Sequence, residues 1–254
     1  MEFLNLCLNI IKTNYLSILL GIRTTLFLSM LGTLFGFIIG LFVGGIRAIK
    51  LDFNAKNYKK RIKKILDGIG RIYIDVFRGT PMIVQSMVIY WGYAFANNGN
   101  TLNLTFAGIL IVSINTGAYL TEIVRGGIDS IDKGQYEGAE SIGMSHWQTM
   151  FYVIMPQVMR NILPGVSNEF INNIKDTSVL NVIGVAELYF ATGKIIRINF
   201  EIFETYLVTC IIYLIITFTI TRILRFFEKK LEGNMNYKIV NTQSYIPLNK
   251  GAKK

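Results

Sequence analysis

The longest stretch of the chain without a charged side chain runs over residues 79–121, which are 43 positions without Asp, Glu, Lys or Arg. This is about twice the roughly 20 residues that a helix needs to cross the hydrocarbon core of a bilayer. A polar, turn-forming run at residues 97–103 divides the stretch. The sequence therefore predicts two membrane-spanning helices, near residues 81–96 and 104–124.

Two further charge-free stretches predict one span each. The first covers the 23 residues 24–46. The second, residues 205–221, extends into apolar positions whose neighbouring arginines can reach the membrane interface. Composition agrees, because only 17% of the 254 residues are charged, against roughly 25% in soluble domains. A membrane protein is favoured over a soluble domain of this length.

A fifth span is predicted over residues 161–188, although Glu169, Lys175, Asp176 and Glu187 fall within it. Of the 26 basic residues, 21 lie in residues 47–78, 125–160 and 222–254, which the positive-inside rule assigns to the cytoplasm. Only an odd number of spans places both the first basic loop and the C-terminus on that side. The net charge of +10 is therefore an orientation signal rather than a sign of nucleic-acid binding.

The predicted fold is an all-α integral membrane protein with five transmembrane helices, an outside N-terminus and a cytoplasmic C-terminus. Residues 1–20 are expected to form a helix along the outer interface. Residues 21–232 are expected to form the transmembrane domain, and residues 233–254 a mobile cytoplasmic tail.

Glycine recurs every fourth residue in the first predicted span, at Gly32, Gly36, Gly40 and Gly44. Such a row lets the backbone of another helix approach closely. Packing within one helix bundle is the favoured interpretation, and a subunit interface is the alternative.

The cytoplasmic connection at about residues 125–160 is too long for an ordinary link and carries helix signals of its own. Asp132 is suited to cap a helix through Ile142, which Gly143 would end in a left-handed conformation. A capping box from Ser145 to Gln148 would start a second helix that ends at Pro156. From these residues alone, the pair could dock in a groove on another protein or lie on the inner leaflet.

Several common kinds of site are absent from the sequence. Cys7 and Cys210 lie in apolar surroundings and form no disulfide framework or metal motif. The single histidine, His146, has no second histidine or cysteine nearby, which argues against a metal or catalytic role. No P-loop motif occurs, so the chain cannot bind a nucleotide in that way.

The cytoplasmic connection carries a family resemblance. Glu137-Gly138-Ala139, then Gly143, then residues 153–156 (Val-Ile-Met-Pro) resemble the EAA motif, EAA-x3-G-x9-I-x-L-P, of permease subunits of ATP-binding-cassette importers. The sequence departs from the motif by small or apolar exchanges at Gly138, Val153 and Met155. Residues 77–81, Gln85 and residues 115–128 and 175–180 are similar to polar amino-acid permeases. The resemblance covers about residues 21–231.

This resemblance implies a type I importer permease fold in the bacterial cell membrane. It also implies partners: a dimer of ATPase subunits, a second permease chain that is a copy or a close paralogue, and an external solute-binding protein. ATP and Mg²⁺ would belong to the ATPase, and this chain would bind no cofactor and catalyse no reaction. The coupling helix that docks on the ATPase would comprise Gln135, Tyr136, Glu137, Gly138, Ala139, Glu140, Ser141 and Gly143.

The charged fifth span holds the candidate substrate site. Each charge in a membrane helix costs roughly 2.5 to 3.5 kcal/mol, so these residues should face a cavity or each other. Asn168 or Glu169, Asn172 and Asp176 fall on one helix face, where Glu169 could receive the ammonium group of an amino acid. Candidate wall residues are Gln85, Asn115 and Thr116. The alternative is an internal ion pair of Lys175, with the asparagines joining neighbouring helices.

The sequence leaves open which amino acid is transported and whether transport is driven by an ATPase or by an ion gradient. A membrane carboxylate favours a cationic amino acid, but it would serve the α-ammonium group of glutamine or cystine equally well. The alternative function is a channel or an ion- or proton-coupled secondary carrier that uses Glu169 and Asp176 as a relay, although this would leave the EAA-like connection unexplained.

Overall fold

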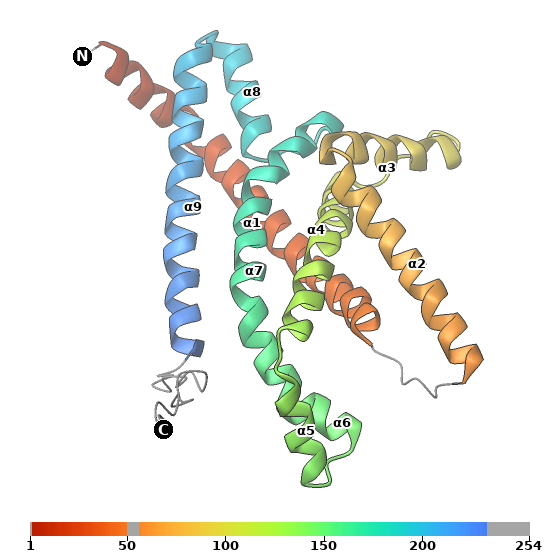
Figure 1. The fold of residues 1–254 in the computed structure, drawn as a ribbon. Helices are drawn as coiled ribbons and strands as arrows, with labels where there is room; N and C mark the ends of the chain where they lie inside the picture. Colours follow the sequence, from red (N-terminus) through yellow and green to blue (C-terminus); the bar gives the residue numbers. More distant parts are fainter. Residues whose placement is uncertain (1, 50–55, 233–254) are drawn as a thin grey trace, which may run out of the picture.

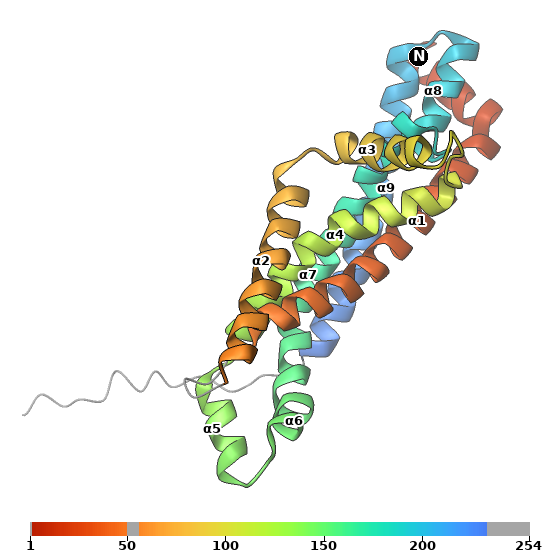
Figure 2. The same ribbon diagram turned by 90° about the vertical axis from the view of Figure 1, so that its right-hand side faces the viewer.

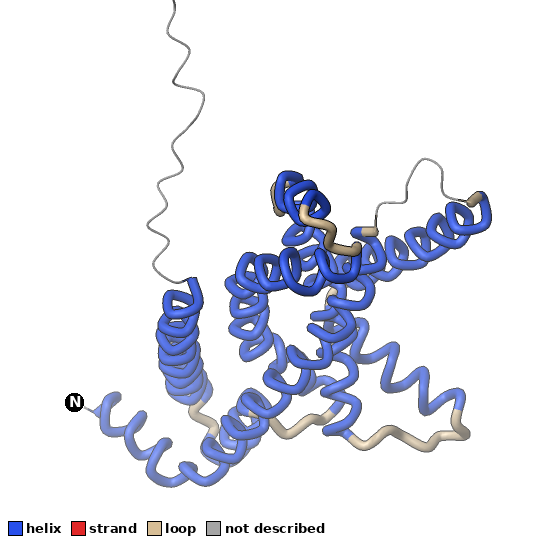
Figure 3. The backbone as a smooth tube through the Cα atoms, turned by 90° about the horizontal axis from the view of Figure 1, so that it is seen from below, coloured by secondary structure: helices blue, strands red, loops and turns tan. Residues whose placement is uncertain are grey.

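The computed structural model describes residues 2–49 and 56–232, and over these residues it contains helices and no strand (Figure 3). The all-α prediction is confirmed for this part of the chain. The predicted tail, residues 233–254, lies outside the described residues. In chain order the elements are α1 (Glu2–Ala48), α2 (Asn57–Gly79), α3 (Met82–Ala96), α4 (Leu104–Asp129), α5 (Lys133–Ser141), α6 (His146–Gln148), the π-helix η1 (Thr149–Ile154), α7 (Met155–Asp176), the 3-10 helix η2 (Thr177–Ile183), α8 (Leu188–Asn199) and α9 (Ile202–Glu232).

The long helices form a bundle with distinct elements at its two ends. Figure 1 shows α1, α4, α7 and α9 running along the bundle, with α7 between α4 and α9. The short helix α3 lies across one end, beside η2. Helices α5 and α6 project beyond the other end in both side views (Figures 1 and 2). The bundle therefore has short helices at one end and a projecting helical hairpin at the other.

The glycine row of α1 packs against α4 of the same chain. A Cβ atom added at Gly40 would lie 2.7 Å from Leu120 Cβ, and one added at Gly44 would lie 2.7 Å from the Thr121 carbonyl oxygen. Distances this short leave room only for glycine, so the two backbones are in near contact. The favoured interpretation, packing within one bundle, is confirmed.

Three described helices are long and apolar enough to cross a bilayer: Glu2–Ala48, Leu104–Asp129 and Ile202–Lys230. A bent pair, residues 146–183 with α8, could act as a fourth span. Helix α3 has 15 residues, a length of about 22 Å, which is less than the roughly 30 Å of the hydrocarbon core. The number of five spans and the orientation of the termini therefore stay predictions.

The expected interfacial helix at residues 1–20 is continuous with the first span. Helix α1 has 47 residues without a break, a length of about 70 Å. This is more than twice the thickness of the hydrocarbon core, so α1 must be strongly tilted or extend beyond it. An interfacial position for its first turns stays a prediction.

The basic segment at residues 47–78, predicted as the cytoplasmic connection between the first two spans, is mostly helix α2, and its cytoplasmic position stays a prediction. Tyr73 donates a hydrogen bond from its hydroxyl to the Ile114 carbonyl oxygen of α4 (2.5 Å), and Ile74 is buried. The many lysines and arginines of this segment lie mainly in the first turns of α2 and are exposed there. The count of basic residues identified the polar face of this amphipathic helix. It gave no sign of the face that packs against the bundle, which carries Tyr73 and Ile74.

The fifth predicted span, residues 161–188, is also interrupted. Helix α7 ends at Asp176, η2 follows, and Gly184 adopts a left-handed conformation (φ 92°) before the chain bends by 55° into α8. Glu187 belongs to this bend and not to the face of α7 that carries Glu169, Asn172 and Asp176. Its fully buried carboxylate accepts hydrogen bonds from the Tyr189 and Phe190 backbone N–H groups (2.9 and 2.8 Å) and from the Tyr213 hydroxyl (3.0 Å). It therefore caps α8 and ties it to α9.

Candidate functional site

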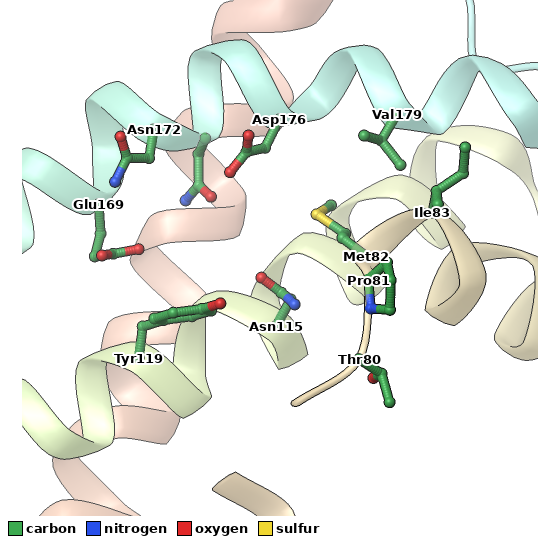
Figure 4. Close-up of a pocket in the computed structure, with 11 residues that line it drawn as sticks. Thr80, Pro81, Met82, Ile83, Asn115, Tyr119, Glu169, Asn172, Asp176 and Val179 are labelled. Carbon is green, nitrogen blue, oxygen red and sulfur yellow. The ribbon is translucent and has the colours of Figure 1, made fainter. Parts of the chain in front are cut away.

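A polar pocket of about 410 Å³ lies between α4, α7 and the link from α2 to α3 (Figure 4). Its volume falls in the range of small-molecule sites. Three separate segments of the chain contribute to it, and each supplies polar groups. The lining residues are Thr80, Pro81, Met82, Ile83, Asn115, Tyr119, Glu169, Asn172, Asn173, Asp176 and Val179.

One face of α7 supplies the charged side of this pocket. Glu169, Asn172 and Asp176 occur at the i, i+3, i+7 spacing that aligns side chains along a helix, and all three line the pocket. Figure 4 shows them along α7, with Asn115 and Tyr119 of α4 facing them across the cavity. The structure thus brings together four of the seven predicted substrate residues: Asn115, Glu169, Asn172 and Asp176.

Asn168, the neighbour of Glu169, does not line this pocket. Adjacent residues of a helix point about 100° apart, and Asn168 lines a second, smaller pocket between α7 and α9. The sequence left Asn168 and Glu169 as alternatives on the stripe, and the packing of α7 places Glu169 there.

Gln85 and Thr116 lie behind the pocket wall rather than in it. The buried Gln85 side chain donates to the Thr80 carbonyl oxygen (2.9 Å) and accepts from Asn115 Nδ2 (2.9 Å), so it orients Asn115. Thr116 donates its hydroxyl to Asn173 Oδ1 (3.0 Å), and Asn173 Nδ2 donates to Thr33 of α1 (2.7 Å). These hydrogen bonds fix the amide groups of α4 and α7.

Arg78 acts electrostatically on Glu169, and Lys175 acts on Asp176, but neither pair is in contact. No salt bridge within 4.0 Å is formed there by Glu169, Asp176 or the exposed Lys175, so the internal ion pair considered from the sequence is not found. Arg78 instead lies over the Tyr119 ring, 5.3 Å from its centroid. Two carboxylates are therefore available to a cationic group that enters the pocket.

Sequence reasoning missed several lining residues. Tyr119 follows Asn115 by one helical turn, so the i, i+4 spacing in a span already singled out could have identified it. Asn173 follows Glu169 at the same i, i+4 spacing, so the same signal could have identified it. Thr80 carried no such signal, because it reaches the pocket only through the link between α2 and α3.

The projecting hairpin has the predicted end signals. The Asp132 side chain accepts from the Gly134 N–H (2.7 Å), Gly143 is left-handed (φ 81°), and Ser145 and Gln148 form a capping box. Pro156 does not end the second helix, and that prediction is wrong. The π-helix η1 leads directly into α7, where Pro156 occupies the first turn and its missing N–H costs little.

The hairpin presents one packed and one exposed side. Ala139 is buried and Tyr136 packs against the bundle, whereas the other predicted coupling residues are exposed. Large apolar side chains are exposed beside them, including Ile142, Trp147, Phe151 and Tyr152. Trp147 and Phe151 stack with ring centroids 6.0 Å apart. An exposed apolar surface on a projecting element is typical of a docking site for another protein.

Hydrogen bonds connect this hairpin to the helix that lines the pocket. Gln157 of α7 donates from Nε2 to Gln135 Oε1 of α5 (3.0 Å). One turn further along α7, Asn161 donates to the Ser130 hydroxyl at the end of α4 (3.0 Å). A displacement of α5 would therefore act directly on α7, and through Asn161 of α7 on the end of α4.

Most of the chain is similar to proteins of one transport family. The model of the family described as "Binding-protein-dependent transport system inner membrane component" matches residues 53–233. The chain belongs to this family. It is thus a multi-pass permease subunit of a binding-protein-dependent transport system of the inner membrane, and not an enzyme.

Curated relatives match over most of their length. The glutamine transport system permease protein GlnP of Escherichia coli K12 is 38% identical over 212 residues, covering 84% of this chain and 91% of the relative. The L-cystine transport system permease protein TcyB of Bacillus subtilis is 35% identical over 213 residues, covering 84% and 85%.

Solved structures share the fold. A crystal structure of an amino acid ABC transporter with histidines matches with a TM-score of 0.76 at 34% identity, over 88% of this chain and 97% of that one. The MetNI methionine ABC transporter matches with a TM-score of 0.70 at 16% identity, over 85% and 96%, which shows the fold alone. The predicted importer permease fold is therefore confirmed.

Proposed function

We propose that this chain is the membrane-spanning subunit of an ATP-binding-cassette importer for polar amino acids. The observation that carries the proposal is the pocket between α4 and α7, with two carboxylates and several amides, in a chain whose relatives are named as glutamine and cystine permeases. An external binding protein would deliver the amino acid, and a separate ATPase would bind ATP and Mg²⁺. The alternative function, an ion- or proton-coupled secondary carrier that uses Glu169 and Asp176 as a relay, has no comparable support.

The pocket suits both charged ends of an amino acid. Glu169 would accept hydrogen bonds from the α-ammonium group, since a charged acceptor strengthens such bonds. Asp176, seven residues further along the same face, would accept from a cationic or amide side chain. The Asn172 amide group can donate to the carboxylate, whereas the Asn115 amide nitrogen already donates to Gln85 and to the Phe77 carbonyl oxygen and presents only its Oδ1 acceptor. The site therefore favours arginine, lysine, histidine or glutamine over purely apolar amino acids.

The projecting hairpin would connect this site to the ATPase. In our proposal the exposed residues of α5, with Gly143, dock on one ATPase subunit of a dimer, and a second permease chain, a copy or a paralogue, docks on the other. Closure of the ATPase pair would displace α5, and the Gln135–Gln157 hydrogen bond would transmit the movement to α7. The pocket would then open alternately to the two sides of the membrane.

The Glu169→Gln substitution tests the substrate site. The amide cannot carry the charge that pairs with ammonium, so we expect the apparent affinity for the transported amino acid to fall about tenfold or more. The measurement is uptake of labelled arginine, lysine, histidine, glutamine and cystine into proteoliposomes that contain the complete transporter.

The matched control is Arg160→Gln, which removes a charge from the same helix at an exposed position outside the pocket. Its uptake should stay within about twofold of the unmodified protein, because no contact to the substrate is lost. Unchanged affinity and rate of the Glu169→Gln variant for every amino acid would remove Glu169 from the site.

A further inference from the structure

A second pocket, of about 170 Å³, lies between α7 and α9 on a different face of α7 from the substrate pocket. It is formed by two turns of each helix, near the end of α9 that carries its charged residues. Its lining residues are Pro164, Ser167, Asn168, Ile171, Thr221, Leu224, Arg225 and Glu228.

Four polar side chains in this pocket lack a partner within the described part of the chain. Neither a side-chain hydrogen bond nor an ion pair is formed there by Ser167, Asn168, Arg225 or Glu228. Arg225 and Glu228 are one turn apart on α9, yet they do not pair with each other. Ser167 is 7% exposed, and its hydroxyl is not among the buried atoms without a partner, so it is open to the pocket. This pocket therefore gathers groups of both charges that have no partner within the described part of the protein, with Arg225 exposed and Glu228 half-buried.

The pocket lies where the sequence of α9 predicts the head-group layer of the membrane. Helix α9 has no charged residue over positions 205–221, and then Arg222, Arg225 and Glu228 follow within seven residues. In an inner-membrane protein, such a boundary marks the passage from acyl chains to the head-group layer. The apolar side chains exposed along α9 on both sides of this boundary include Ile211, Leu214, Ile215, Phe218, Phe226 and Phe227.

We propose that this pocket binds the head group of a zwitterionic aminophospholipid, such as phosphatidylethanolamine. Arg225 donates to the lipid phosphate, and the Ser167 hydroxyl donates to another phosphate oxygen. Glu228 and the Asn168 amide oxygen accept from the primary ammonium group. Leu224 and Ile171 contact the glycerol and upper acyl atoms. The site is independent of amino-acid transport.

The charge balance of the pocket selects among head groups. A choline group has no N–H and cannot donate to Glu228. A glycerol head group carries only the phosphate charge, which leaves Glu228 without a cation and close to a negative lipid. In phosphatidylethanolamine the primary ammonium group donates to Glu228, and the phosphate of the same lipid accepts from Arg225. The predicted order of binding is therefore phosphatidylethanolamine before phosphatidylglycerol and phosphatidylcholine.

The test is native mass spectrometry of the purified complete transporter, after equilibration with equal amounts of the three lipids. We expect phosphatidylethanolamine to be retained preferentially, and Arg225→Gln and Glu228→Gln each to lower its retention about tenfold. Arg222→Gln is the matched control, because Arg222 lies over the Phe218 ring at 4.9 Å and does not line the pocket. It should retain the lipid.

A third variant, Asn168→Leu, approaches the pocket from α7 and should also lower retention. Thermal melting of each variant shows whether it is folded, and only folded variants are compared. Equal retention of all three lipids, or full retention by all three pocket variants, would overturn the proposal. Displacement of the bound lipid by free amino acid would overturn it too, because the pocket would then be a second amino-acid site.

Discussion

Replacing Gly40 with leucine is expected to separate α1 from α4 and to remove most of the folded chain from the membrane. An added Cβ would lie 2.7 Å from Leu120 Cβ and 2.9 Å from the Leu120 carbonyl carbon. Leu120 is fully buried, so neither its side chain nor its backbone can move away freely. Extra groups in a packed core typically cost 1–3 kcal/mol, and here one of the opposing atoms belongs to the backbone. The measurement is the yield and melting temperature of the protein extracted in mild detergent.

Gly45 provides the matched control on the same helix. A Cβ added at Gly45 would meet no atom within 4 Å, so leucine there faces open space. Leucine is also a better helix former than glycine by about 0.8 kcal/mol, so stability should be unchanged or slightly higher. Equal losses for the two variants would mean that the close approach of α1 and α4 does not determine stability.

Features that depend on a few neighbouring residues were predicted well from the sequence. The cap at Asp132, the left-handed Gly143 and the capping box from Ser145 to Gln148 each need only local hydrogen bonds, and all three were found. The glycine row likewise identified the packed face of α1. The rule that proline ends a helix failed at Pro156, because a π-helical turn precedes it and places it in the first turn of α7.

Features that depend on which helices become neighbours could not be predicted. Periodicity placed Glu169, Asn172 and Asp176 on one face of α7 but could not choose between Asn168 and Glu169, because that choice depends on the positions of α4 and α9. Glu187 appeared only as one more charge in a span. Its capping hydrogen bonds to Tyr189 and Phe190 are local, but its burial depends on α9, from which Tyr213 donates a hydrogen bond 26 residues further along the chain.

The polar pocket shows the same division between local and long-range information. Its charged side follows from the spacing along a single helix. Its opposite side needs α4 and the link to α3 to pack against that helix, which Gln85 and Thr116 support from behind with buried hydrogen bonds. Of the three residues expected in the pocket wall, Asn115 lines the pocket. Gln85 and Thr116 lie behind it and position the side chains of Asn115 and Asn173.

The second large effect is expected from Glu137→Lys on the projecting hairpin, which should abolish transport while the chain still inserts and folds. Glu137 is exposed, and its side chain forms no hydrogen bond or ion pair with the described residues, so reversing its charge breaks no internal contact. At a docking surface, a mismatched charge costs about 2–5 kcal/mol. This corresponds to a loss of roughly 30-fold or more in association with the ATPase.

The decisive measurements for this variant are co-purification of the ATPase subunit and uptake, both compared with the melting temperature of the permease. Glu137→Gln is the matched control, since it keeps the shape and removes the charge without reversing it, and most transport should remain. A lysine variant with a normal melting temperature but neither ATPase nor uptake places the coupling contact on α5. Full uptake by the lysine variant would contradict that contact, and the exposed aromatic pair of Trp147 and Phe151 would then be the surface on which the ATPase docks.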